Sequence, residues 1–370
     1  MASIPRQDSI VRYAVVGQGY ISQAAVLPAF RHAKRNSRLV ALVSGEARKR
    51  KELSKKYRVP AYDYSEYDSL LESGAVDAVY IALPNDQHRD FTERAARRGV
   101  HVLCEKPLAV DERECKAMIA TCRRHKVRLM TAYRLHFERA TLTALSSVGK
   151  GLIGEARLFV SSFTMAVEAP NIRLEERERG GGTFYDIGIY CINAARHLFG
   201  AEPVEVFATT AGKRSQGSEE SASAILRFPG DRLATFCVSF GADKTSGYRI
   251  VGTKGSIRVE PGYELAKGLE IHVTRNGRTK KISYGKRDQF APELLHFSDC
   301  VLAGRDPLPS GEEGLADVRV ISALYKSAER GRAVRLGAKR IARKPTLKHE
   351  TTRPPVRRMP ELVGATPPSG

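Results

Sequence analysis

The chain has 370 residues, of which 42% are hydrophobic and 28% charged, values typical of a globular protein with two or three domains. It contains no run of 18 apolar residues, which excludes a membrane-spanning helix. Residues 1–10 lack the apolar core of a secretory signal, and none of the six cysteines forms a C-x-x-C pair. We therefore expect a cytoplasmic protein with free thiols and no contact with a membrane.

The formal net charge of +20 is unevenly distributed along the chain. Nine basic and two acidic side chains lie in residues 334–370, and eleven basic and two acidic ones in residues 31–58. Such clusters suit a solvated surface, a phosphorylated ligand or nucleic acid. Because the sequence has no helix-turn-helix, zinc-finger or RNA-recognition motif, we favour a solvated surface and do not expect nucleic-acid binding.

Strands and helices alternate through residues 1–130. Short, continuous apolar runs predict strands at residues 10–16, 39–43, 77–83, 101–103 and 128–131. Helical spacing predicts helices at 21–34, with a kink at Pro28, and at 46–57, 87–98 and 111–125. Continuous apolar strands between helices are typical of a doubly wound parallel sheet, so we predict an α/β Rossmann domain over residues 1–130.

Successive strands follow over residues 131–336. The predicted strands are 156–165, 204–211, 222–228, 233–240, 248–251, 256–259 and 269–274, and the predicted helices are 183–198, 289–302 and 314–329. This succession predicts an α+β domain with a large, open, mainly antiparallel sheet that binds substrate and forms oligomers. Residues 337–370 are basic and rich in proline, so we predict a disordered tail.

A glycine-rich turn follows the first predicted strand. Gly17 and Gly19 open a G-x-G-x-x-G pattern that continues through Tyr20 and Ile21 and has Ser22 at its third glycine position. Gly17 permits a tight turn, Gly19 lets the backbone approach a pyrophosphate, and a small third residue lets helix and strand pack. At the head of a β-α-β series, the pattern predicts dinucleotide binding, with the phosphates at the helix N-terminus.

The end of the second predicted strand indicates which dinucleotide binds. An NAD enzyme usually carries an acidic residue there, which accepts a hydrogen bond from the ribose 2′-hydroxyl. Here the strand ends at Ser44, and the cations Arg48 and Lys49 follow it. A hydroxyl and two cations suit a 2′-phosphate, so the sequence favours NADP over NAD.

Two further motifs complete a recognisable pattern. Glu105-Lys106-Pro107 follows a predicted strand, and Asp186-Ile-Gly188-Ile-Tyr190 lies in a predicted helix. With the glycine-rich turn, they resemble the glucose–fructose oxidoreductase/inositol dehydrogenase/rhizopine-catabolism (Gfo/Idh/MocA) family, and most of all its glucose–fructose oxidoreductases. The resemblance extends over about residues 11–336. It implies a Rossmann domain, an open sheet that holds a sugar against the nicotinamide, and hydride transfer to or from that sugar.

The resemblance also implies roles for individual residues. Lys106 matches the active-site lysine of the family, Asp186 the acid that binds substrate hydroxyls, and Tyr190 the general acid/base. A phenol is poorly ionised at neutral pH, and a nearby cation favours its ionised form, so Tyr190 with Lys106 is a coherent pair. The alternative for each residue is structural: a core tyrosine, a polar helix neighbour and a surface lysine.

Other candidates follow from their positions in the pattern. The remaining predicted cofactor contacts are Leu83, Pro84, Asn85, His88, Glu105 and Lys106. The predicted sugar contacts are Lys106, Tyr133, Arg134, His136, Arg173, Asp186 and Tyr190. The nine histidines are dispersed without a metal-ligand spacing, so we predict no metal site.

We therefore predict an NADP-dependent oxidoreductase that oxidises an aldose to a lactone, reduces a keto-sugar, or does both. The alternatives are a reductase of an anhydrofructose-type keto-sugar and a non-catalytic protein that senses NADP. The three residues Lys106, Asp186 and Tyr190 argue against the sensor, which needs none of them. An exposed sheet face predicts a homodimer or homotetramer.

Overall fold

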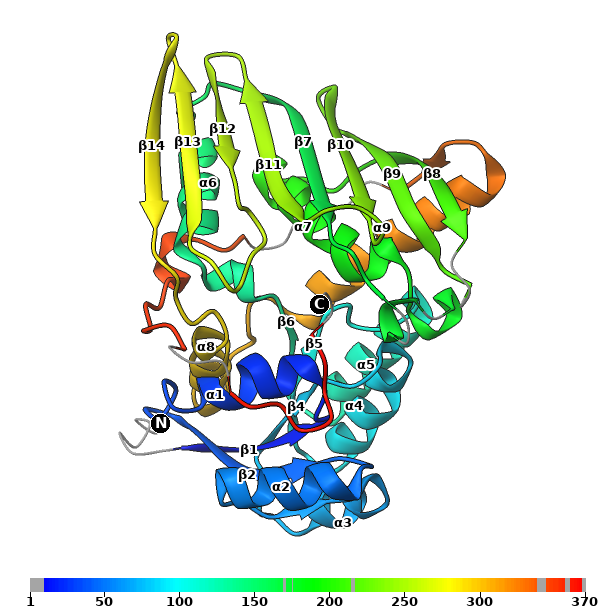
Figure 1. The fold of residues 1–370 in the computed structure, drawn as a ribbon, viewed down its shortest axis with the longest axis vertical. Helices are drawn as coiled ribbons and strands as arrows, with labels where there is room; N and C mark the ends of the chain where they lie inside the picture. Colours follow the sequence, from blue (N-terminus) through cyan, green and yellow to red (C-terminus); the bar gives the residue numbers. More distant parts are fainter. Residues whose placement is uncertain are drawn as a thin grey trace. The chain divides into compact units, whose positions relative to one another are not determined.

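The computed structural model describes residues 10–168, 171–174, 176–213, 217–337, 344–356 and 360–367. The chain forms two compact units, drawn in Figure 1. The first comprises residues 1–134, 288–315 and 352–368, and the second comprises residues 135–287, 316–351 and 369–370. The first crossing lies close to the predicted division at residue 130. The chain then returns to the first unit twice, over residues 288–315 and 352–368. The predicted domains 131–336 and 337–370 are continuous and do not contain these returns.

The first unit contains a parallel sheet, which has six strands within the described residues in the order β3-β2-β1-β4-β5-β6 (Figure 1). The strands are β1 (Val11–Val16), β2 (Ser37–Val43), β3 (Ala61–Tyr62), β4 (Ala78–Ile81), β5 (His101–Glu105) and β6 (Leu129–Ala132). The strand order reverses between β1 and β4, the position at which doubly wound sheets bind ligands beyond the carboxyl ends of their strands. The predicted Rossmann fold of this unit is confirmed.

The helices of the first unit are α1 (Leu27–Ala29), α2 (Ala47–Tyr57), α3 (Tyr67–Glu72), α4 (His88–Arg97), α5 (Glu112–Arg124) and α8 (Ala291–Leu302). Helices α2, α4 and α5 follow the prediction, the segment near Pro28 differs from it, and α3 was not predicted. The helix predicted over residues 21–34 is instead a π-helical turn, Ser22–Val26, followed by α1 alone. Proline lacks an N–H and its ring crowds the preceding turn, so this segment cannot continue as one regular helix.

Helix α8 packs against β1 and β2 of the first unit, although chain order placed it in the second domain. The Tyr13 hydroxyl lies 2.7 Å from Oγ of Ser298, and Asn36 donates a 2.9 Å hydrogen bond to the carbonyl of Leu295. The predicted position of this helix in the second domain is therefore corrected. Its apolar face covers strands that lie more than 250 residues earlier, and periodicity carries no signal of such a distant partner.

The second unit contains a mixed sheet, with nine strands within the described residues in the order β14-β13-β12-β11-β7-β10-β9-β8-β15. The strands are β7 (Ala156–Thr164), β8 (Glu205–Lys213), β9 (Glu219–Phe228), β10 (Arg232–Ser239), β11 (Thr245–Gly252), β12 (Gly255–Val259), β13 (Leu269–Arg275), β14 (Arg278–Tyr284) and β15 (Val334–Arg335). Neighbours are antiparallel except β7 and β10, which run parallel. The predicted α+β class and mainly antiparallel sheet are confirmed.

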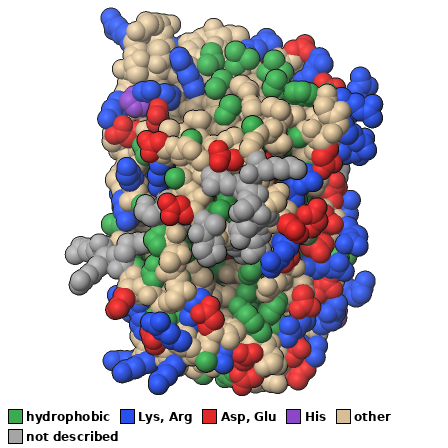
Figure 2. Space-filling view, turned by 45° about the vertical axis from the view of Figure 1, so that its right-hand side comes forward, with side chains coloured by type: hydrophobic (Ala, Val, Ile, Leu, Met, Phe, Trp, Pro, Cys, Tyr) green, Lys and Arg blue, Asp and Glu red, His purple; other side chains and the backbone are tan. Residues whose placement is uncertain are grey.

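Helices cover one face of this sheet, and strands β7 to β10 expose several large apolar side chains. Helix α7 (Ile189–Phe199) packs against β7 and β10, and α6 (Arg139–Gly149) packs against α7, β12 and β13. Helix α9 (Gly311–Arg330) belongs to this unit from residue 316 onward. The large exposed apolar side chains of β7 to β10 are Leu158, Val160, Phe207, Ile225 and Leu233. Hydrophobic side chains gather in the upper half of Figure 2, where this sheet lies.

Parts of the predicted disordered tail make specific contacts. Residues 344–356 include a 3₁₀ turn, Leu347–His349, and Val363 is only 7% exposed. The composition of residues 337–370 predicts disorder because few apolar residues are available to be buried. Two hydrogen bonds between the Val363 backbone and the Gln23 side chain hold this part of the tail, and composition does not reveal them. No helix among the described residues has the length and apolarity needed to cross a membrane.

Candidate cofactor site and active site

The glycine-rich turn connects β1 to the π-helical turn at the carboxyl end of the first unit's sheet. Gly17 has a φ of +90°, and a Cβ there would lie 2.4 Å from the carbonyl oxygen of Ala82, at the end of β4. Ser22 Oγ donates a 2.5 Å hydrogen bond to the Gly17 carbonyl. No described atom lies within 4 Å of a Cβ placed at Gly19, so its backbone is open to a ligand. Tyr20 and Ile21 follow in the same turn.

The end of β2 presents the residues predicted to contact a 2′-phosphate. Ser44 directly follows the strand and is 3% exposed. Lys49, at 8% exposure, donates a 2.5 Å hydrogen bond to Glu46, so a carboxylate holds the ammonium that a phosphate would need. Arg48 points elsewhere and pairs with Glu52 on the exposed face of α2. Of the two predicted cations, Lys49 therefore lies beside Ser44's loop, and Arg48 belongs to a surface ion pair.

A residue that the sequence analysis missed fixes this loop. Arg50 donates a 2.7 Å hydrogen bond to the carbonyl of Ser44 and forms an ion pair with Asp63. The sequence did not single out Arg50, because the third of three consecutive cations, Arg48-Lys49-Arg50, is expected on a charged, solvated helix face. Arg50 thus holds the backbone at Ser44, whose hydroxyl accepts a 3.3 Å hydrogen bond from the Glu46 amide.

His88 lies inside the protein rather than at a ligand surface. Its ring nitrogens lie 3.0 Å from the carbonyls of Leu83 and Pro107, in the loops that follow β4 and β5. The side chain is 0% exposed, and burial lowers its pKa from the ordinary value near 6.5 because it disfavours the charged imidazolium. His88 thus joins the Leu83-Pro84-Asn85 loop to the Glu-Lys-Pro loop, and the cofactor contact predicted for it stays a prediction.

Lys106 directly follows β5 at the same sheet edge as the glycine-rich turn. The preceding Glu105 accepts a 2.8 Å hydrogen bond from the Tyr80 hydroxyl and a 3.3 Å hydrogen bond from the Lys106 amide. Burial raises the pKa of Glu105, and the Tyr80 hydrogen bond and the Lys106 charge oppose that shift. Glu105 thus supports the backbone at Lys106 from the interior side.

A second buried carboxyl group lies close enough to affect Glu105. Glu293 of α8 is fully buried, and neither of its oxygens has a hydrogen-bond partner among the described residues. Desolvation and the nearby Glu105 carboxylate hold the pKa of Glu293 well above its ordinary value. The sequence analysis missed Glu293 because it lies in a separate stretch of chain with no motif around it.

The segment after β6 supplies two of the predicted sugar contacts. Tyr133 and Arg134 are each 5% exposed, and Arg134 donates a hydrogen bond to the side chain of Gln289. Both residues belong to the first unit, together with Lys106. Their burial leaves little of either side chain for a ligand.

In the second unit, Arg173 and Asp186 form a half-buried pair. Arg173 Nε donates a 2.6 Å hydrogen bond to Asp186, which lies in the π-helical turn Phe184–Gly188. Gly182 makes this turn possible: its φ is +108°, and a Cβ there would lie 2.3 Å from the hydroxyl of Tyr325. π-Helical turns occur often at functional sites, and two of the three predicted site motifs, the glycine-rich turn and Asp-x-Gly-x-Tyr, each adjoin or contain one.

Tyr190 lies in the first turn of α7 and is partly exposed. Its ring centre lies 5.6 Å from that of Phe163 and 5.8 Å from that of Tyr263. The aromatic rings fix the plane of the phenol, and partial exposure leaves part of the side chain accessible. This environment differs from the fully buried core position considered as its structural alternative.

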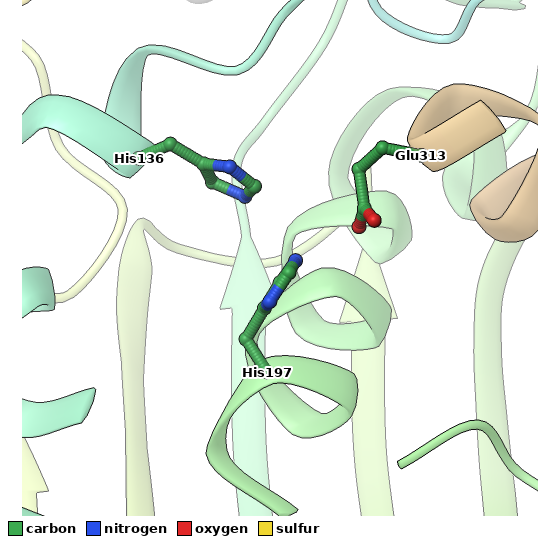
Figure 3. Close-up of side chains that lie close together, drawn as sticks. All are labelled: His136, His197 and Glu313. Carbon is green, nitrogen blue, oxygen red and sulfur yellow. The ribbon is translucent and has the colours of Figure 1, made fainter. Parts of the chain in front are cut away.

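His136 belongs to the core of the second unit. It is 3% exposed, its Nε2 lies 2.8 Å from Asn193 Oδ1, and its ring meets that of His197 edge to face at 4.7 Å (Figure 3). Glu313, also labelled in Figure 3, belongs to the first unit. Nε2 of this buried imidazole is engaged by an amide, and the sugar contact predicted for His136 stays a prediction.

Comparison with known proteins places this geometry in a family. Residues 11–133 match the oxidoreductase family model with an NAD-binding Rossmann fold, and residues 141–258 match the GFO/IDH/MocA C-terminal domain. A D-xylose 1-dehydrogenase (NADP⁺) of Haloarcula marismortui is 31% identical over 339 residues, covering 89% of this chain and 94% of the relative.

Solved structures agree. An aldose-aldose oxidoreductase from Caulobacter crescentus, complexed with glycerol, matches with a TM-score of 0.84 and 36% identity over 88% of this chain and 100% of its own. A 3-ketoreductase from Actinomadura kijaniata, in complex with NADP and TDP-benzene, matches with a TM-score of 0.80 and 27% identity over 86% and 98%. The resemblance inferred from the Glu-Lys-Pro and Asp-x-Gly-x-Tyr motifs is confirmed, and the chain belongs to the GFO/IDH/MocA oxidoreductase family.

Proposed function

We propose that this protein is an NADP-dependent oxidoreductase that transfers a hydride between the nicotinamide and a CH–OH carbon of a sugar. The observation that carries the proposal is the position of Lys106 at the carboxyl end of β5, on the same sheet edge as the open backbone of Gly19. Ligands of doubly wound sheets bind at this edge. The relatives named for D-xylose and aldose oxidation support a sugar as the substrate class.

NADP⁺, when bound, supplies the hydride acceptor. The Gly17–Gly19 turn would hold the pyrophosphate, and Ser44 with Lys49 would hold the 2′-phosphate. Oxidation of a CH–OH group breaks the C–H bond with its electron pair and releases the hydroxyl proton, so the chain must accept one proton. Tyr190 would take that proton as general base, and the Lys106 ammonium would stabilise the negative charge that develops on the substrate oxygen. Asp186, oriented by Arg173, would accept hydrogen bonds from other sugar hydroxyls.

Purified protein with NADP⁺ and a panel of aldoses that includes D-xylose tests the proposal. We expect absorbance at 340 nm to rise with at least one aldose, and Lys106→Ala and Tyr190→Phe to abolish the rise while both variants still bind NADPH. A wild-type protein that binds NADPH but neither oxidises an aldose nor reduces a keto-sugar would contradict it and favour the sensor.

We also propose that the protein forms a homodimer through the exposed apolar face of the second unit's sheet. Register places Phe207 opposite Ile225 and Leu233 opposite Leu158, so the apolar side chains continue across four strands. Contiguous apolar patches of this kind mark interaction sites. Ile225→Lys should convert the dimer to a monomer in light scattering, whereas Lys326→Ala, at an exposed position of α9 in the same unit, should not.

All six cysteines lie among the described residues and are free, and five of them are buried. Free thiols suit a reducing compartment, which supports a cytoplasmic location. Fractionation of the native host would test this.

A further inference from the structure

The C-terminal segment, residues 360–367, is tied to the glycine-rich turn by one side chain. Gln23 Nε2 donates a 2.9 Å hydrogen bond to the Val363 carbonyl, and the Val363 amide donates a 2.8 Å hydrogen bond to Gln23 Oε1. Gln23 is 1% exposed, and the same Nε2 donates a 2.9 Å hydrogen bond to the carbonyl of Gln18, between the two glycines. Two reciprocal bonds fix the backbone of Val363 one side chain away from the turn.

The other contacts of this segment lie on α2. A Cβ at Gly364 would lie 3.2 Å from Lys49 Cε and 3.4 Å from Glu46 Oε2, so glycine lets the backbone pass close over that pair. Gly364 also has a φ of +54°, a conformation that glycine adopts most readily. Lys56 donates a 2.8 Å hydrogen bond to the carbonyl of Glu361. The segment therefore runs from the phosphate turn to the residues at the 2′-phosphate position.

A separate contact anchors the chain before it reaches this position. Arg353 Nε donates a 3.1 Å hydrogen bond to the carbonyl of His32, and its own carbonyl accepts a 3.4 Å hydrogen bond from the Asp288 amide. In Figure 1 the red C-terminal trace runs beside α1, which directly follows the π-helical turn that contains Gln23. The chain is thus held at Arg353, before the segment begins, and again at Val363 within the segment.

The segment borders the nucleotide surface without filling it. The space around Gly19 stays open among the described residues. Lys49 is only 8% exposed, whereas a lysine in a surface helix is normally solvated. Gly364, Ala365 and Thr366 are small, so a bulky ligand group can lie beside them. These features suit a cover over the adenosine 2′-phosphate end of a dinucleotide.

We propose that residues 360–367 close over the adenosine end of bound NADP and slow its release. The inference rests on the proposed use of NADP and adds a binding element from outside both family domains. Release of the nucleotide requires Val363 to leave Gln23, so the two reciprocal hydrogen bonds contribute to the barrier for dissociation. Differences in affinity between related complexes lie mainly in their dissociation rates, and a cover acts on that rate.

Stopped-flow displacement of NADPH, followed by its fluorescence, tests the proposal on three variants of the full enzyme. Ending the chain after Val356 removes the segment but keeps the Arg353 anchor. Val363→Pro keeps the segment but removes the amide that donates to Gln23. Thr366→Ala, at an exposed position of the same segment, is the matched control.

We expect the truncated chain and Val363→Pro to release NADPH about tenfold faster or more, and Thr366→Ala to release it at the wild-type rate. An unchanged rate in both altered chains would overturn the proposal. Slower release would also overturn it, because the segment would then compete with the nucleotide. Failure of sugar oxidation with intact NADPH release kinetics would remove the proposed function alone, whereas a full chain that does not bind NADPH would overturn both.

Discussion

The Tyr80 hydroxyl donates a 2.8 Å hydrogen bond to Glu105, the residue directly before Lys106. This bond stabilises the carboxylate form of a group whose pKa burial raises. Without it, Glu105 would keep its proton to higher pH. The charge next to Lys106 therefore depends on Tyr80.

Tyr80→Phe should move the acidic limb of the kcat/KM pH profile to higher pH. The loss of the hydrogen bond raises the pKa of Glu105 further, so the carboxylate beside Lys106 forms at a higher pH. The measurement is the pH–rate profile with saturating NADP⁺. Tyr67→Phe, which removes another buried hydroxyl from the first unit, should lower stability without moving the profile, and a shift of equal size there would contradict the account.

Glu293→Gln should make the protein more resistant to unfolding at high pH. The folded-state pKa of Glu293 lies well above the ordinary value of 4.5, so the neutral acid's contribution to stability is complete at low pH and is lost as pH rises through the folded-state pKa. Glutamine cannot ionise, and we expect a gain of about 1–3 kcal/mol above the folded-state pKa. Urea unfolding at pH 5 and pH 9 measures it, and an equal change at both pH values would contradict the assignment.

Glu46→Gln should increase the affinity for NADP relative to NAD. Glu46 holds the Lys49 ammonium in an ion pair with a 2.5 Å N–O distance, and removal of its charge frees Lys49 for the 2′-phosphate. We expect a gain of about two- to fivefold, as an ion pair near the surface is worth about 1 kcal/mol at most. Titration at low and high salt should show the gain shrink with ionic strength. Lys49→Ala should abolish the preference for NADP; its retention would show that other residues read the 2′-phosphate.

Asp186→Asn should weaken the use of sugar without weakening the binding of NADP. The change removes the charge that Arg173 pairs with and the strongest hydrogen-bond acceptor in the turn. We expect kcat/KM for the sugar to fall about 10- to 100-fold, since hydrogen bonds to charged groups contribute about 1.5–3 kcal/mol. Arg177→Lys, in the pair with Glu329 elsewhere in the second unit, is the matched control and should leave kcat/KM unchanged.

The sequence predicted the Rossmann sheet well because its strands are continuous apolar runs and its glycine turn has a local signature. It missed β14, Arg278–Tyr284, because an exposed edge strand rich in charge carries no apolar alternation. It placed α8 in the wrong unit because helix amphipathicity does not identify the partner sheet. His88 and His136 are both buried, and the position of a histidine in a motif does not reveal its burial.

The contact between Val363 of the tail and Gln23 could not be predicted from the sequence either. Val363 is held mainly by its backbone, and any residue with an N–H and a carbonyl could occupy that position. Only the buried Gln23 specifies the contact, and it lies more than 300 residues away. Neither Gln23 nor Val363 stands out in the sequence, so this contact could not be predicted.

Transfer of deuterium from a C1-deuterated aldose to NADP⁺ tests the central claim most directly. We predict that NADPD forms, detected by NMR, with an aldose from the panel, and that Lys106→Ala and Tyr190→Phe form none while retaining NADPH binding. Reduction of NADP⁺ without deuterium in the product, or undiminished transfer by both variants, would contradict hydride transfer at Lys106 and Tyr190.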